Sequence, residues 1–311
     1  METQVLSRQQ AFALGYSDKQ IKARIRRGEW EHVRRGVYVD GPAWRAMDAL
    51  GRHRVSIQAV RLTLNDDAVV SHISAAILHG WDSWRVPLDT VTVTREPPQH
   101  PRREAGVDHH VATLAADEVV EIRGMRVTSP ERTMVDVARS YAFEQAVVLC
   151  DGALRSGAAL GRALELYLRQ SQWPGARHAL PAIEFADGGS ESVGESRLRV
   201  LCHRHGLPRP ILQAPIYGLD GCVIARGDLL FEDERTLVEF DGKLKYGRGA
   251  RFDVDPREVL FKEKRREDAI REEAGLEVVR VVWSDLDSPD HTAARLRAAF
   301  ARAHARHHRA A

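Results

Sequence analysis

Long apolar runs, a secretory leader and a cysteine framework are all missing from this 311-residue sequence. Without a run of about 18 apolar residues, no membrane span is expected. The stretch METQVLSRQQ at the amino end lacks the apolar core of a secretory signal. Cys150, Cys202 and Cys222 are odd in number and widely spaced, which suits neither a disulfide framework nor a zinc site. We therefore expect a protein of the reducing cytoplasm, with no membrane partner.

Net charge is also small, at a formal +2, but the charges are unevenly distributed. Residues 19–35 hold seven Lys or Arg against two acids, and residues 291–311 hold five Arg and no acid. Local basic patches of this kind attract a phosphate backbone. The proportions of 43% hydrophobic and 29% charged residues are typical of a globular protein. At this length we expect two or three domains.

Residues 1–40 predict two short helices followed by a hairpin. Ser7-Arg8-Gln9-Gln10 and Ser17-Asp18-Lys19-Gln20 each match a capping box, and WEHVRRGVYV at 30–39 alternates around a basic turn. This order predicts a winged helix-turn-helix whose helix at about 18–27 enters the major groove of DNA. A solvated basic helix is the alternative. The predicted nucleic-acid contacts are Lys19, Lys22, Arg24, Arg26, Arg27, Arg34 and Arg35.

Residues 41–188 predict a mixed α+β region, which ends at the linker signal Gly188-Gly189-Ser190. A short strand and a helix are expected in AVVSHISAAILHGW, a strand in VTVTRE at 91–96, and a helix in SPERTMVDVAR at 129–139. The phrases RRGVY, SHISAAILHGW and SPERTMVDVAR together resemble the AbiEi antitoxin family of type IV toxin–antitoxin systems, over about the first 170 residues. The resemblance implies an N-terminal winged helix that binds promoter DNA and a following domain linked to antitoxicity.

Acidic residues interrupt two apolar strands in GDLLFEDERTLVEFDGKLKYG, residues 227–247. Carboxylates are rare inside strands, and a hairpin here is expected to gather Asp228, Glu239 and Asp241. Such a cluster repels itself unless a proton or a cation neutralises it, and Mg²⁺ prefers oxygen ligands. A metal, a polarised water and a nearby positive charge are the components of metal-assisted phosphodiester hydrolysis. The alternative is a charged sheet edge that discourages aggregation.

The order helix, strand, strand, helix, strand, helix over residues 190–300, with Glu239-Phe-Asp241-Gly-Lys243, resembles the PD-(D/E)XK nuclease superfamily. VEFDGK and GLEVVRVVW resemble its very-short-patch-repair-type branch. The resemblance implies that Asp228 and Glu239 bind the metal and that Glu195 is the helix glutamate of the superfamily. In the superfamily a lysine stands two residues after the second metal-binding acid, and this sequence has Asp241 at that position. Either Asp241 replaces it, or Lys243 or Lys264 supplies the positive charge.

These observations predict an α+β multidomain protein: a winged helix-turn-helix (1–40), an AbiEi-like α+β middle domain (41–188) and an α/β PD-(D/E)XK nuclease-like domain (189–311). The expected function is a Mg²⁺- or Mn²⁺-dependent DNA endonuclease, acting on double-stranded DNA in phage or plasmid defence by analogy only. The alternative is an antitoxin or transcriptional repressor whose nuclease-like domain is inactive. The sequence leaves a homodimer open. The predicted catalytic residues are Glu195, Asp228, Glu239, Asp241, Lys243 and Lys264.

Overall fold

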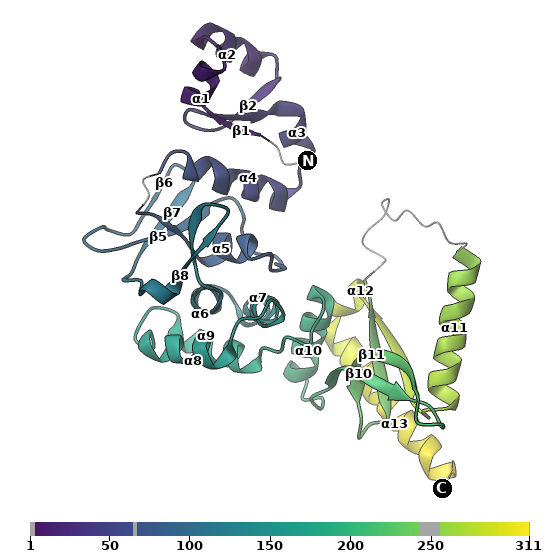
Figure 1. The fold of residues 1–311 in the computed structure, drawn as a ribbon. Helices are drawn as coiled ribbons and strands as arrows, with labels where there is room; N and C mark the ends of the chain where they lie inside the picture. Colours follow the sequence, from purple (N-terminus) through teal and green to yellow (C-terminus); the bar gives the residue numbers. More distant parts are fainter. Residues whose placement is uncertain (1–3, 65–66, 243–255, 311) are drawn as a thin grey trace. The chain divides into compact units, whose positions relative to one another are not determined.

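The chain forms an α+β protein of two compact units, residues 1–186 and 187–311 (Figure 1). The computed structural model describes residues 4–64, 67–242 and 256–310. Within these ranges, no helix is both long and apolar enough to cross a membrane.

The first unit begins with a three-stranded sheet of order β1-β3-β2, formed by Val5–Ser7, Trp30–Arg34 and Val37–Asp40. Two helices lie between β1 and β2: α1 (Arg8–Ala13) and α2 (Asp18–Arg26). Both predicted capping boxes are confirmed, because Ser7 and Ser17 each accept the backbone N–H three residues on while Gln10 and Gln20 accept the return bond. Ala11, Ile21 and Tyr38 form the small core of this segment.

The rest of the first unit combines a six-stranded mixed sheet with helices. Helices α3 (Gly41–Ala46) and α4 (Ala49–Arg61) lead into the sheet. Its order is β6-β7-β5-β4-β9-β8, from Arg102–Glu104, Val107–Val111, Val91–Arg95, Val69–Val70, Met125–Thr128 and Val119–Ile122. The helical part comprises η1 (Ala116–Glu118), α5 (His72–Leu78), α6 (Pro130–Ser140), α7 (Phe143–Arg155), α8 (Leu160–Arg169) and α9 (Ala176–Phe185). The predicted strand at 91–96 and helix at 129–139 are confirmed to within a residue.

A buried ionic network joins α6 to the neighbouring segments of this unit. Arg132 is 1% exposed. Its Nη1 lies 2.5 Å from Glu118 Oε2, and its Nε lies 3.0 Å from Asp136 Oδ2. The guanidinium also stands 5.3 Å from the centre of the Trp173 ring. Buried charges of opposite sign are tolerated only when they are paired and hydrogen-bonded, so this network fixes how α6 packs.

A buried histidine lies close to this network in the first unit. His72 is 7% exposed, and its backbone is left-handed with φ of 50°. Its ring stacks on His110 with 3.8 Å between the ring centroids. Burial lowers the pKa of His72 to about 3. The charge of Asp136 opposes this shift, whereas His110, Arg139 and Arg132 add to it.

We expect the free energy of unfolding of the first unit to fall as the pH drops below about 6.5. The unfolded chain takes up a proton there while folded His72 stays neutral, so each pH unit costs up to about 1.4 kcal/mol. His72→Asn tolerates the left-handed backbone and removes the titration, so its stability should fall less steeply. Urea unfolding at pH 7, 6 and 5 measures both slopes through tryptophan fluorescence, since five of the six tryptophans lie in this unit. Parallel slopes would contradict the prediction.

The second unit places helices on both faces of a four-stranded sheet. The sheet order is β10-β11-β12-β13, from Ile211–Tyr217, Val223–Phe231, Thr236–Asp241 and Glu277–Val282; only β12 and β13 are parallel. Helices α10 (Val193–Arg204), α12 (Trp283–Leu286) and α13 (Pro289–Ala310) bury Leu198, Leu286 and Leu296 in one core. On the other face, Ile270 of α11 (Pro256–Glu272) packs with Leu237 and Val278. Figure 1 shows α11 and α13 flanking the sheet.

Strand β10 is missing from the order of helices and strands that the sequence predicts for residues 190–300. Its sequence, ILQAPIY, does not alternate regularly between apolar and polar residues, and it contains Pro215. Proline is found in sheets almost only in edge strands, because it cannot donate a backbone hydrogen bond. The structure places β10 at one edge of the sheet, where it pairs antiparallel with β11. The unit therefore runs helix, strand, strand, strand, helix, strand and two helices.

Candidate functional site

Glu195 is held rigidly in the first turn of α10. Its carboxylate accepts hydrogen bonds from the Glu191 N–H (2.8 Å), the Ser192 hydroxyl (2.7 Å) and the Gln213 side-chain amide (2.9 Å). Gly194 allows this close packing, because a Cβ there would lie 1.9 Å from Phe240 Cε1. Glu195 is 6% exposed. Burial raises its pKa; the hydrogen bonds from Glu191 and Ser192 oppose that rise, and the charge of Asp228 adds to it.

Asp228 lies where the pairing of β11 with β12 ends. The paired register runs from Phe231↔Thr236 to Leu229↔Val238. Beyond it, the Asp228 carboxylate reaches across and accepts the Phe240 N–H at 2.8 Å. Asp228 therefore approaches the backbone between Glu239 and Asp241 while its charge acts on Glu195. The structure brings these two predicted acids, Asp228 and Glu195, together.

Glu239 belongs to a different charged group, toward α11 and β13. It makes an ion pair with Arg266 of α11 and lies 3.9 Å from Arg280 Nε, its register neighbour on β13. Arg280 in turn lies 3.2 Å from Glu267. Glu239 is thus already neutralised by arginine.

The predicted cluster of Asp228, Glu239 and Asp241 is therefore divided rather than gathered at one point. In the part of the chain that the structure describes, no three His, Cys, Asp or Glu side chains are placed to hold a metal ion together. The physical reason is that Asp228 bonds to the backbone of β12 whereas Glu239 faces two arginines. Asp241 is half-buried at the end of β12. Lys264 is exposed on α11, and Lys243 lies outside the described residues.

Three residues of this region were missed by reasoning from the sequence: Gln213, Arg266 and Arg280. Gln213 was missed because β10 was missed. Arg266 and Arg280 lie in a charged helix and a buried strand, where a basic residue is most simply a solvated one. Only the packing of α11 and β13 around β12 reveals that both arginines point to Glu239.

The predicted nucleic-acid residues of the first unit separate into anchored and exposed ones. Arg24 pairs with Glu29 at 2.8 Å and lies over the Tyr16 and Trp30 rings. Arg34 donates to Thr63 (2.7 Å) and to the Ala105 carbonyl (2.6 Å). Arg27 lies 3.5 Å from Glu29. The exposed members of the set are Lys19, Lys22, Arg26, Arg27 and Arg35.

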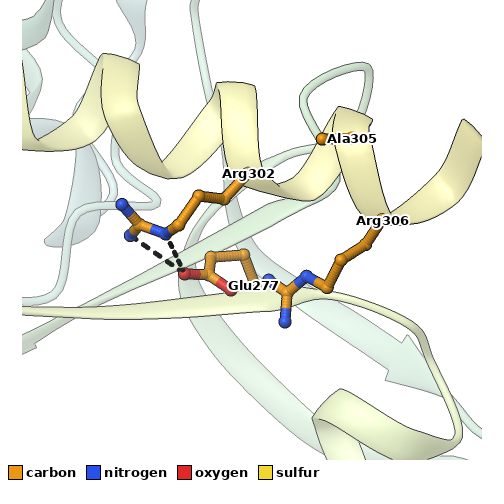
Figure 2. Close-up of a pocket in the computed structure, with 4 residues that line it drawn as sticks. All are labelled: Glu277, Arg302, Ala305 and Arg306. Carbon is orange, nitrogen blue, oxygen red and sulfur yellow. Dashed lines mark hydrogen bonds and ion pairs between the residues drawn. The ribbon is translucent and has the colours of Figure 1, made fainter. Parts of the chain in front are cut away.

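The basic residues of α13 are partly engaged within the second unit. Figure 2 shows Arg302 and Arg306 on either side of Glu277, the first residue of β13. Arg302 Nη2 lies 3.0 Å from Glu277 Oε1, and Arg306 pairs with the other carboxylate oxygen. Glu277 has 13% of its side chain exposed. These two ion pairs hold α13 on the sheet. A structural role is therefore enough to explain Arg302 and Arg306 without contact to nucleic acid.

The fold and the site together define an α+β protein with two units. One carries an exposed basic helix, and the other carries the buried Glu195 beside the half-buried Asp228. No family model matches the chain. Two Mycobacterium tuberculosis proteins, uncharacterized protein Rv2248 (strain ATCC 25618 / H37Rv) and uncharacterized protein MT2308 (strain CDC 1551 / Oshkosh), are each 30% identical over 283 residues, covering 89% of this chain and 95% of the relative. The chain belongs to the family of these two mycobacterial proteins.

A solved structure also resembles part of the fold. The crystal structure of the RV2827C protein from Mycobacterium tuberculosis is 14% identical and superposes with a TM-score of 0.39, covering 68% of this chain and 79% of that one. A TM-score at this level assigns no shared function.

Proposed function

We propose that the protein is a Mg²⁺- or Mn²⁺-dependent DNA endonuclease whose second unit is a PD-(D/E)XK-type domain. The observation that carries the proposal is the buried carboxylate of Glu195 beside the half-buried Asp228, where the ladder between β11 and β12 stops. A buried carboxylate with a second carboxylate near it is costly unless a cation or proton offsets the charge. Hard divalent cations prefer such oxygen donors.

In this proposal Asp228 and Glu239 hold the metal and Glu195 assists them in binding it. A bound Mg²⁺ would polarise the attacking water and the scissile phosphate. Glu239 must first leave Arg266, and the released guanidinium then lies beside the site as a positive charge for the phosphate. The superfamily has a catalytic lysine at the position of Asp241. Arg266 is therefore a third candidate, with Lys243 and Lys264, for the positive charge that this lysine would supply.

The test is cleavage of supercoiled plasmid by the purified full-length chain with Mg²⁺, with Mn²⁺ and with EDTA. Nicked or linear product with either metal, and none with EDTA, is the expected result. Intact plasmid, linear duplex and single strands under every condition would overturn the proposal.

The first unit supplies DNA binding in this proposal, through a winged helix-turn-helix followed by an AbiEi-like domain. Its support is the exposed Lys19, Lys22 and Arg26 on α2, a capped helix packed on a small sheet. Helices of this kind enter the major groove, and exposed lysine and arginine neutralise phosphates.

Removing Lys22 and Arg26 together should weaken DNA binding uniformly across sequences. If each contacts one phosphate, the Lys22→Ala/Arg26→Ala variant should lower the slope of log affinity against log salt by about 2. Fluorescence anisotropy with a labelled duplex from 50 to 300 mM NaCl measures the slope. Arg177→Ala on α9, also exposed, is the matched control. Equal slopes for all three proteins would show that α2 does not touch the backbone.

A repressor or antitoxin with a silent nuclease-like domain is the second candidate, and one observation favours it. Glu239 already has two arginine partners, so this acid needs no metal for charge balance. Tight binding to the promoter of its own gene, without cleavage of any substrate, is what this candidate predicts. A homodimer on a two-fold symmetric site is compatible with either function.

A further inference from the structure

We infer that Gln213 is a positioning residue of the acidic site: it holds the Glu195 carboxylate toward Asp228 for metal binding. The inference rests on the proposed endonuclease function. It comes from three observations on β10: the backbone conformation of Gln213, its place opposite Asp228 and the hydrogen bond made by its side chain.

The backbone of Gln213 is left-handed inside a strand. Its φ is 50°, in the middle of β10. Residues with a Cβ rarely adopt this conformation, and it persists only where the surroundings impose it. The antiparallel register pairs Leu212 with Leu229 and Ala214 with Gly227, so Gln213 falls opposite Asp228. The irregularity thus lies beside the candidate metal ligand.

On the paired strand, β11, the side chains switch from one face of the sheet to the other at the same place. Leu229 packs in the core shared with α10, whereas a Cβ on Gly227 would meet Leu237, a residue of the opposite core, at 2.2 Å. In a regular strand, residues two apart share a face. The regular alternation is therefore broken between Gly227 and Leu229. This break leaves Asp228 free to turn toward β12 and Glu195 rather than follow the pleat.

The side chain of Gln213 forms a hydrogen bond with the carboxylate of Glu195. Its Nε2 donates to Glu195 Oε2 at 2.9 Å. An ionised carboxylate only accepts hydrogen bonds, so the amide nitrogen, not the oxygen, must face it. Glu191 and Ser192 belong to the same end of α10 as Glu195, whereas Gln213 comes from the sheet. Gln213 therefore ties the Glu195 carboxylate directly to the sheet, from the strand that pairs with the one carrying Asp228.

Substitution by glycine separates positioning from folding. Gln213→Gly removes the amide but suits a positive φ, so the relief of the backbone offsets the lost hydrogen bond and the melting temperature should change by only a few degrees. Groups that orient metal ligands typically change metal affinity by about 10- to 100-fold when removed. We expect the Mn²⁺ dissociation constant of the full chain, measured by calorimetry, to rise by about that factor, with a parallel fall in plasmid cleavage.

Two further variants separate the effect of the amide from the effect of the backbone conformation. Gln213→Asn tolerates the left-handed backbone but is one methylene too short, so it should resemble the glycine variant. Arg235→Gly is the matched control, because Arg235 also has a positive φ (44°) but lies in the turn at the other end of β12. It should gain the same backbone relief and leave Mn²⁺ affinity unchanged.

The outcomes distinguish the inference from the function on which it rests. Cleavage and Mn²⁺ affinity at the wild-type level in Gln213→Gly and Gln213→Asn would overturn the positioning role and leave the endonuclease intact. A wild-type chain that neither binds Mn²⁺ nor cleaves would overturn both. Equal loss in Arg235→Gly would show that the effect belongs to backbone stiffness and would also overturn the role of the amide.

Discussion

Replacing Asp228 by asparagine should lower metal-dependent cleavage by about 100- to 1000-fold while leaving the second unit folded. Metal-assisted stabilisation of a phosphoryl transition state is worth several kcal/mol, and each 1.36 kcal/mol is a factor of ten in rate. The asparagine oxygen can still accept the Phe240 N–H that Asp228 accepts at 2.8 Å. What disappears is the negative charge next to Glu195, so stability should hold or rise.

The matched control for this variant is Glu232→Gln. Glu232 is an exposed carboxylate in the turn between β11 and β12, so the variant makes the same change of charge in the same hairpin. Plasmid cleavage rates and thermal unfolding of both variants, beside the wild-type chain, provide the comparison. A cleaving Asp228→Asn protein would remove Asp228 from the metal site. Loss of cleavage in Glu232→Gln as well would point to a non-specific charge effect on DNA binding.

Truncating Arg132 to alanine should destabilise the first unit by about 3–5 kcal/mol. Removing one member of a buried ionic network leaves its partners charged and without compensation. Here Asp136 has none of its side chain exposed and Glu118 only 9%. The Trp173 ring loses the guanidinium above it as well. Urea unfolding followed by tryptophan fluorescence at pH 7 measures the difference.

Arg169→Ala tests whether burial, rather than charge, is the cause. Arg169 lies 3.8 Å from the same Glu118 carboxylate, but half of its side chain is exposed. Exposed pairs contribute about 0–1 kcal/mol, so this variant should lose less than about 1 kcal/mol. Similar losses for Arg132→Ala and Arg169→Ala would mean that the network contributes little beyond surface pairing.

Local sequence signals predicted most elements of the fold, because their causes are local. The capping boxes at Ser7 and Ser17 set the starts of α1 and α2, and proline after Ser129 sets the start of α6. Alternation predicted β2, β3 and β5. Strand β10 was missed because Gln213 and Pro215 interrupt its pattern, and its place in the sheet depends on pairing with β11. The winged-helix and nuclease-like assignments, and the catalytic roles, stay predictions.

The sequence alone determined which chemical groups the candidate site contains: acids at 195, 228, 239 and 241, and a basic helix near the amino end. Only the tertiary structure decided how they group. Asp228 joins Glu195 and Gln213, Glu239 joins Arg266 and Arg280, and Arg24 and Arg34 are anchored within the first unit. These partners lie from 5 to 71 positions apart along the chain. Most such pairings depend on the packing of helices and sheets, which no local pattern encodes.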